Sequence, residues 1–88
     1  MPRARAVLLI EDIPSLQLIY RLTLAAAGYE VLVAGSASAG MALFRDQLPP
    51  VVLLDMQLPD RNGLTLLGDI LTRAPETVVI VVTAHGSI

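Results

Sequence analysis

The feature that most constrains the fold is an alternation of two local patterns along the 88 residues. Short apolar runs rich in Val, Leu and Ile occur at Ala6–Ile10, Val51–Leu54 and Val78–Val82. Continuous runs of this length are typical of strands that are buried on both faces. A weaker run at Glu30–Ala34 indicates a fourth strand, nearer an edge of the sheet.

Segments with helical spacing separate these runs. We predict a first helix from about Pro14 to Ala27, because proline suits the first helical turn. A second is predicted from about Ser38 to Gln47, with Ser36 or Ser38 as its cap. A third is predicted from about Gly63 to Arg73. The spacing assigns apolar faces to Leu18, Ile19, Leu22 and Ala26 on the first helix, Ala39, Ala42 and Leu43 on the second, and Leu64, Leu67, Ile70 and Leu71 on the third.

The resulting order is β-α-β-α-β-α-β. This alternation predicts an α/β fold, a doubly wound parallel sheet with right-handed crossovers and helices on both faces. The length allows one small domain, and no linker or repeat divides residues 1–88.

Composition argues against several classes of function. Apolar residues make up 55% of the chain and its mean hydropathy is +0.69, yet the longest apolar runs fall far below the ~20 residues of a membrane-spanning helix. A net charge of −2 and the scarcity of aromatic residues argue against direct contact with nucleic acid. The chain has no cysteine, which excludes disulfides and thiolate metal sites and allows a cytoplasmic location.

Reactive side chains follow three of the four predicted strands. Glu11 and Asp12 follow the first, Asp55 the third and Thr83 the fourth. Ligands of open α/β sheets bind at the carboxyl ends of the strands, and neighbouring strands lie only ~4.8 Å apart. Carboxylate oxygens suit Mg²⁺, which can stabilise a transferring phosphoryl group, and the threonine hydroxyl can donate to a phosphate oxygen.

Each of these residues also has a purely structural interpretation. Acidic residues after strands often cap helices, and Asp12 stands just before a predicted helix. Their joint occurrence at strand ends favours a shared site. His85 is interpreted as a surface-loop residue, and Met41 and Met56 as packing residues.

Three segments resemble bacterial response-regulator receiver domains: Val7–Asp12, Val52–Gly63 and Val79–Ala84. The middle one is the most specific, since Asp55 follows apolar residues and is followed by proline four positions later and glycine eight positions later. The resemblance covers essentially the whole chain and implies the flavodoxin-like receiver fold with strand order 2-1-3-4. The run after Val82 is also similar to receivers of sigma-54-dependent transcription activators.

The resemblance implies a role for each matching residue. Asp55 would accept a phosphoryl group from a histidine kinase or phosphotransfer protein. Glu11, Asp12 and Asp55 would hold Mg²⁺, and the backbone carbonyl of Gln57 would complete the metal shell. Thr83 would be the switch hydroxyl. Such a protein regulates an output such as transcription, and its only chemistry would be Mg²⁺-dependent self-phosphorylation and dephosphorylation.

The chain departs from the family at its end. A complete receiver has five strands and five helices, so residues 1–88 are expected to be the N-terminal portion, without the fourth helix, fifth strand and fifth helix. The chain contains no lysine, whereas the family uses one to contact the phosphoryl group. A protein-binding module that is not phosphorylated is therefore an alternative. Val78–Val82 would become an open edge, which predicts a homodimer, strand exchange or aggregation; alternatively, the chain is a piece of a longer protein in which this edge is covered.

Two classes of enzyme fit the sequence less well. Phosphatases that use an aspartate after an apolar strand place a second aspartate two residues later, where this chain has Gln57. Nucleotide-binding enzymes need a glycine-rich phosphate loop, and neither G-x-G-x-x-G nor the Walker pattern occurs.

Overall fold

The computed structural model describes residues 5–82, in which strand and helix alternate strictly. The elements are β1 (Ala6–Ile10), α1 (Pro14–Ala26), β2 (Glu30–Ala34), α2 (Ala37–Gln47), β3 (Val51–Asp55), α3 (Gly63–Arg73) and β4 (Val78–Val82). Every predicted element is present. Each predicted bound lies within one residue of the observed one.

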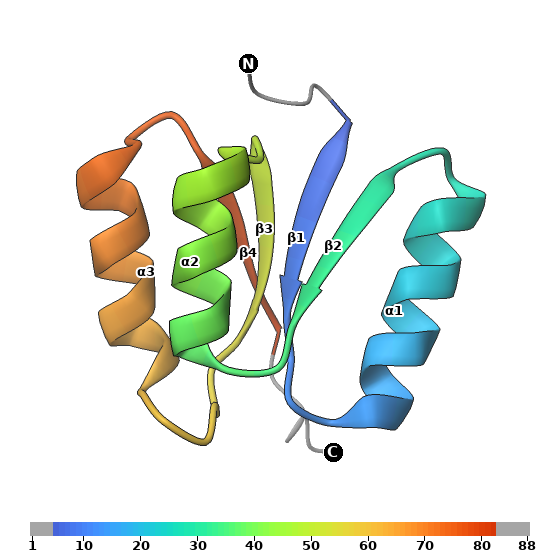
Figure 1. Cartoon of the computed structure of the whole chain (residues 1–88), viewed down its shortest axis with the longest axis horizontal. Coiled ribbons are helices and arrows are strands. Elements are labelled where there is room, and N and C mark those ends of the chain that lie inside the picture. Colours follow the sequence, from blue (N-terminus) through green and yellow to red (C-terminus); the bar gives the residue numbers. More distant parts are fainter. Residues whose placement is uncertain (1–4, 83–88) are drawn as a thin grey trace.

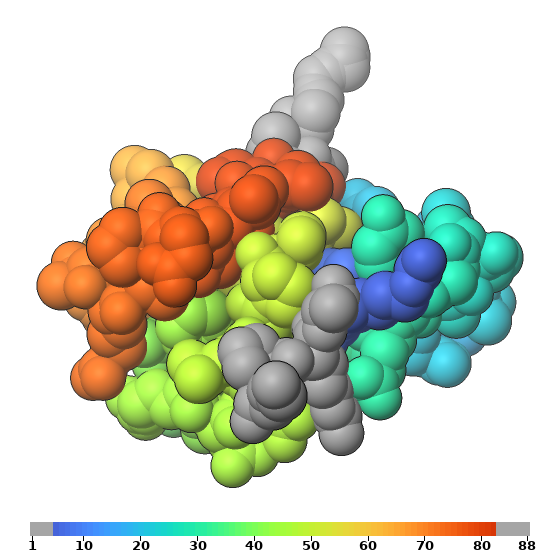
Figure 2. All heavy atoms as spheres, turned by 90° about the horizontal axis from the view of Figure 1, so that it is seen from above, coloured from blue at the N-terminus to red at the C-terminus, as the bar shows by residue number. Residues whose placement is uncertain are grey.

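The strands form one parallel sheet in the order β2-β1-β3-β4. This confirms the doubly wound α/β fold and the predicted strand order. Helices α2 and α3 cover one face of the sheet and α1 covers the other (Figure 1). In the space-filling view from above, the red residues of β4 lie at the surface along one margin of the molecule (Figure 2).

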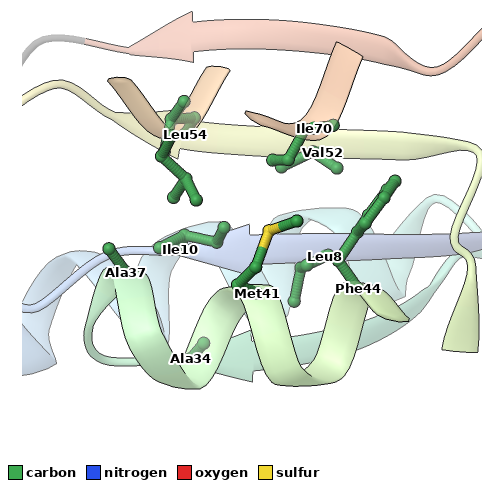
Figure 3. Packing of buried hydrophobic residues seen from close by; sticks show 10 residues of the cluster. Leu8, Ile10, Ala34, Ala37, Met41, Phe44, Val52, Leu54 and Ile70 are labelled. Carbon is green, nitrogen blue, oxygen red and sulfur yellow. The ribbon is translucent and has the colours of Figure 1, made fainter. Parts of the chain in front are cut away.

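The main core lies between the sheet and the two helices α2 and α3. Side chains of α2 point toward β1 and β3 in the close-up (Figure 3). The fully or almost fully buried members are Leu8, Ile10, Ala34, Ala37, Met41, Phe44, Val52, Leu54, Leu66 and Ile70. This cluster fixes the position of the strands whose ends carry the acidic residues.

The apolar face predicted for α2 is wrong. The helix buries Ala37, Gly40, Met41 and Phe44, whereas Ala39 and Ala42 are exposed and Leu43 is half-buried. The buried side of α2 is therefore rotated about the helix axis from the predicted one. Gly40 allows this orientation, because a Cβ built there would stand 2.6 Å from Cδ1 of Ile10. The missing side chain lets this part of the helix approach β1.

The predicted faces of α1 and α3 also need correction. Helix α1 has no buried residue, and Leu18, Ile19, Leu22 and Ala26 are exposed. The half-buried side of this helix is instead formed by Leu16, Tyr20 and Leu24. Helix α3 buries Leu66 and Ile70, while Leu64 and Leu71 are exposed. The inward stripe of α3 runs from Gly63 at spacings of three and four residues.

Between residues 5 and 82, no helix is long and apolar enough to cross a membrane.

Candidate functional site

The carboxyl edge of the sheet brings the predicted acidic residues together. Ile10 pairs with Leu54 in neighbouring strands, so Glu11 and Asp55 stand one step further along β1 and β3. The Glu11 amide donates to the carbonyl of Ala34 at 3.0 Å, which extends the pairing of β1 with β2 beyond the strand end. The backbone ladder therefore places both carboxylates at one edge.

Three carboxylates form a cluster at this edge. Oxygen atoms of Glu11, Asp12 and Asp55 all lie within 4.8 Å of one another. Glu11 and Asp55 are buried, with 2% and 3% of their surfaces exposed, whereas Asp12 is exposed. Three acidic groups this close suit a divalent cation with oxygen ligands. Of the other predicted site residues, Gln57 lies in the loop after β3, and Thr83 lies outside the described residues.

Asp12 does not cap helix α1. The N-cap position is Ile13, and no side chain caps the helix there. Glu11 is instead the residue that is held locally, because its Oε2 accepts a 3.1 Å hydrogen bond from the Ile13 amide. The side-chain amide of Gln17 also donates to the Glu11 carbonyl. The helix-cap interpretation of Asp12 is therefore wrong, and its carboxylate is available at the mouth of the cluster.

The cluster changes the acidity of Glu11. Burial raises the pKa of this carboxyl from 4.5 to about 7, and the neighbouring Asp55 and Asp12 add to the increase. The hydrogen bond from the Ile13 amide acts in the opposite direction. An ionised Glu11 is thus unfavourable without a counter-charge, which is the situation that a bound cation relieves.

The loop after β3 is shaped by backbone contacts. Oδ1 of Asp55 accepts a hydrogen bond from the Gln57 amide at 3.0 Å, and the Gly63 amide donates to the Met56 carbonyl at 3.0 Å. Gln57 and Asn62 form an antiparallel bridge. A Cβ at position 63 would stand 2.7 Å from Cα of Met56, so glycine is required for this close approach.

Gly63→Ala should destabilise the protein by about 1–3 kcal/mol, since the added methyl group meets backbone rather than a movable side chain. Gly68→Ala in the same helix is the matched control, because a Cβ there has no atom within 4 Å. It should stabilise the protein by about 0.5–1 kcal/mol. Urea unfolding measures both changes. Equal effects of the two variants would contradict the close approach at Gly63.

Two residues around the site were not identified from the sequence. Gln17 supports Glu11 from α1, and Asp60 accepts hydrogen bonds from the start of α2. Asp60 joins residues that lie more than 20 positions apart in the chain. Local spacing therefore carries no signal for this contact, although Asp60 stands in the most specific motif.

Comparison with known proteins identifies the class. The family model described as the response regulator receiver domain matches residues 7–88. The chain belongs to this family, whose members are the receiver domains of response regulators in two-component systems. The fold and the acidic edge described above are consistent with that membership.

Individual relatives agree with the family model. The regulatory protein LuxO of Vibrio vulnificus is 31% identical over 80 residues, which cover 91% of this chain and 18% of LuxO. The probable transcriptional regulatory protein TcrX of Mycobacterium tuberculosis is 34% identical over 82 residues, which cover 93% of this chain and 35% of TcrX. The chain thus spans about a fifth to a third of these curated relatives.

Solved structures show the same fold. A CheY-like receiver domain protein from Methanospirillum hungatei has a TM-score of 0.90 at 28% identity, covering 98% of this chain and 69% of that one. The response regulator MaeR, solved with bound beryllium trifluoride, has a TM-score of 0.80 at 32% identity, covering 99% of this chain and 70% of that one.

Proposed function

We propose that this receiver domain accepts a phosphoryl group on Asp55 with the help of a Mg²⁺ ion at the carboxyl edge of the sheet. The observation that carries the proposal is the cluster of Glu11, Asp12 and Asp55, whose oxygens lie within 4.8 Å of one another. Support also comes from MaeR, whose structure contains beryllium trifluoride.

The donor set fits magnesium. Glu11, Asp12 and Asp55 would supply carboxylate oxygens, and Gln57 would supply its backbone carbonyl. Hard oxygen ligands with room for water and phosphate oxygens are what Mg²⁺ requires. When bound, the ion neutralises charge on the phosphoryl oxygens during transfer. Burial and the neighbouring carboxyl groups of Asp55 and Asp12 raise the pKa of Glu11, so a positive ion at the cluster would favour its ionised form.

The proposed chemistry is one phosphoryl transfer. A carboxylate oxygen of Asp55 forms a bond to phosphorus while the bond between phosphorus and the donor breaks. When the donor is a phosphohistidine, the imidazole nitrogen leaves and takes up a proton. Later hydrolysis returns the carboxylate and inorganic phosphate. The 3.0 Å bond from the Gln57 amide to Oδ1 holds the orientation of the nucleophile.

The wider biology follows as part of this proposal. The donor would be a histidine kinase or phosphotransfer protein in the cytoplasm, Thr83 would act as the switch hydroxyl, and residues 1–88 would form the N-terminal portion of the receiver. The output would be transcriptional regulation, as the name of TcrX indicates for that protein.

The test is incubation of the chain with acetyl phosphate, with and without Mg²⁺, followed by intact-mass measurement. We expect a gain of one phosphoryl group only when Mg²⁺ is present. No gain in either condition would contradict the proposal. That result would favour the alternative, a protein-binding module that is not phosphorylated.

We further propose that, in a chain of these 88 residues alone, the edge of β4 pairs with a second copy of the chain. Within the described residues β4 pairs only with β3, and Val78, Ile80 and Val81 are 55%, 48% and 42% exposed. An uncharged, β-branched edge strand offers unpaired backbone groups to another strand. Pairing of two β4 strands would satisfy these groups and bury the exposed side chains.

Ile80→Glu should weaken self-association about a hundredfold or more, because each of the two copies loses a buried apolar side chain worth about 1.5–3 kcal/mol. Leu64→Glu is the matched control, because Leu64 is also exposed but lies on α3, away from the edge. Light scattering across a dilution series measures the change. A wild-type chain that stays monomeric at high concentration would contradict the pairing.

A further inference from the structure

Asp60 joins two segments that are far apart in the chain. Its Oδ1 accepts a 2.8 Å hydrogen bond from the amide of Ala37, and its Oδ2 accepts a 3.0 Å bond from the amide of Ser38. These amides belong to the first turn of α2. Both carboxylate oxygens of this loop residue therefore accept hydrogen bonds from helix α2. The same two bonds lower the pKa of Asp60, so the carboxylate is ionised at neutral pH.

Helix α2 already has a conventional cap. The Ser36 hydroxyl accepts a 3.1 Å hydrogen bond from the Ala39 amide at the N-terminus of this helix. Ser36 and Asp60 together thus satisfy three amides of the first turn. Of these capping hydrogen bonds, only those of Asp60 connect that turn to the loop after the acidic cluster, so its contact differs from an ordinary cap.

The loop end of this connection lies next to the proposed metal site. Asp60 stands between Gln57 and Asn62, the two residues that form the antiparallel bridge. The Gly63-to-Met56 hydrogen bond closes the loop one step further out. Asp60 therefore holds the tip of a loop whose base contains Gln57. The adjacent Arg61 forms an ion pair with Asp69, which connects the same tip to helix α3 as well.

We propose that Asp60 is a positioning residue, which fastens the loop after β3 to helix α2 and so holds the Gln57 carbonyl in place for the metal ion. This inference rests on the proposed Mg²⁺ site. Helix α2 is a rigid support because Met41 and Phe44 anchor it in the core. A ligand that is held in place before the ion arrives binds it more tightly than one on a free loop.

The test compares Asp60→Ala with Ser36→Ala, since both remove a capping group from the same helix but only the first releases the loop. We expect Asp60→Ala to raise the Mg²⁺ dissociation constant about tenfold. This is the lower limit of the roughly 10- to 100-fold loss of metal affinity that follows removal of a residue supporting a metal ligand. Ser36→Ala should change it by less than about twofold, because the Ser36 hydroxyl accepts its hydrogen bond from Ala39 of the same helix and not from the loop. Asp60→Asn retains one acceptor oxygen and should fall between wild type and Asp60→Ala. Calorimetric titration with MgCl₂ measures all four proteins.

A second readout separates this inference from the proposed function. In metal-free protein, amide hydrogen exchange at Gln57 and Gly63 should accelerate in Asp60→Ala and stay unchanged in Ser36→Ala. Equal Mg²⁺ affinities and exchange rates in the two variants would overturn the positioning role and leave the metal site intact. A wild-type chain that binds no Mg²⁺ would overturn the metal site, and the exchange rates alone would then decide whether Asp60 holds the loop.

Discussion

Asp55→Asn should take up no phosphoryl group from acetyl phosphate and Mg²⁺, whereas the wild-type chain takes up one. The amide oxygen is a poor nucleophile, and it lacks the charge that the proposed Mg²⁺ site requires. Asp46→Asn is the matched control, since Asp46 is an exposed carboxylate on α2. It should take up phosphate as the wild type does. Intact-mass measurement over time distinguishes the three proteins.

The same substitution should also affect Glu11. Burial is the main cause of the raised pKa of the Glu11 carboxyl and Asp55 adds to it, so replacement of Asp55 by Asn should lower that pKa part of the way. Titration of the Glu11 side chain by NMR measures this change. Phosphoryl uptake by Asp55→Asn at the wild-type rate would show that the acceptor is a different residue. An unchanged pKa of Glu11 would show that the two carboxyl groups do not interact.

Glu11→Gln should make the metal-free protein more stable at pH 8 by up to about 3 kcal/mol, at about 1.4 kcal/mol for each unit of pKa shift. The pKa of Glu11 rises from 4.5 in the unfolded chain to about 7 in the fold. The stability that the protonated Glu11 contributes to the fold is therefore fully present below about pH 4.5 and is lost as the pH rises to about 7. Glutamine cannot ionise and still offers an oxygen to the Ile13 amide.

Urea unfolding between pH 4.5 and pH 8 without metal measures this effect. The stability of the wild type should fall relative to Glu11→Gln across this range, and Mg²⁺ at 100 times its dissociation constant should restore about 2.7 kcal/mol to the wild type alone. Glu76→Gln, at the opposite edge of the sheet, is the control and should follow the wild-type profile. Parallel profiles for wild type and Glu11→Gln would contradict the burial of an uncompensated carboxyl at the site.

The sheet was predictable because its signal is local. Runs such as Ala6–Ile10 and Val78–Val82 have no polar interruption, and each proved to be a strand with the predicted bounds. The acidic cluster followed from the same reasoning, because the ends of parallel strands meet at one edge. The strand order alone was sufficient to predict that Glu11 and Asp55 lie close together.

The helix faces could not be predicted as reliably. Apolar residues surround much of α1 and α3, so spacing alone did not determine which of them face the sheet. The rotation of α2 depends on the contact between Gly40 and Ile10. The connection from Asp60 to Ala37 also depends on how distant elements pack. Each of these features is tertiary, and none leaves a periodic pattern in the sequence.

The most direct test of the account locates the phosphoryl group chemically. Borohydride reduces an aspartyl phosphate to homoserine with release of phosphate, and fragment mass spectrometry then identifies the altered position. After incubation with acetyl phosphate and Mg²⁺, the account predicts homoserine at position 55 and at no other aspartate. Homoserine at a different position, or a phosphate that remains on a serine or threonine after reduction, would contradict it.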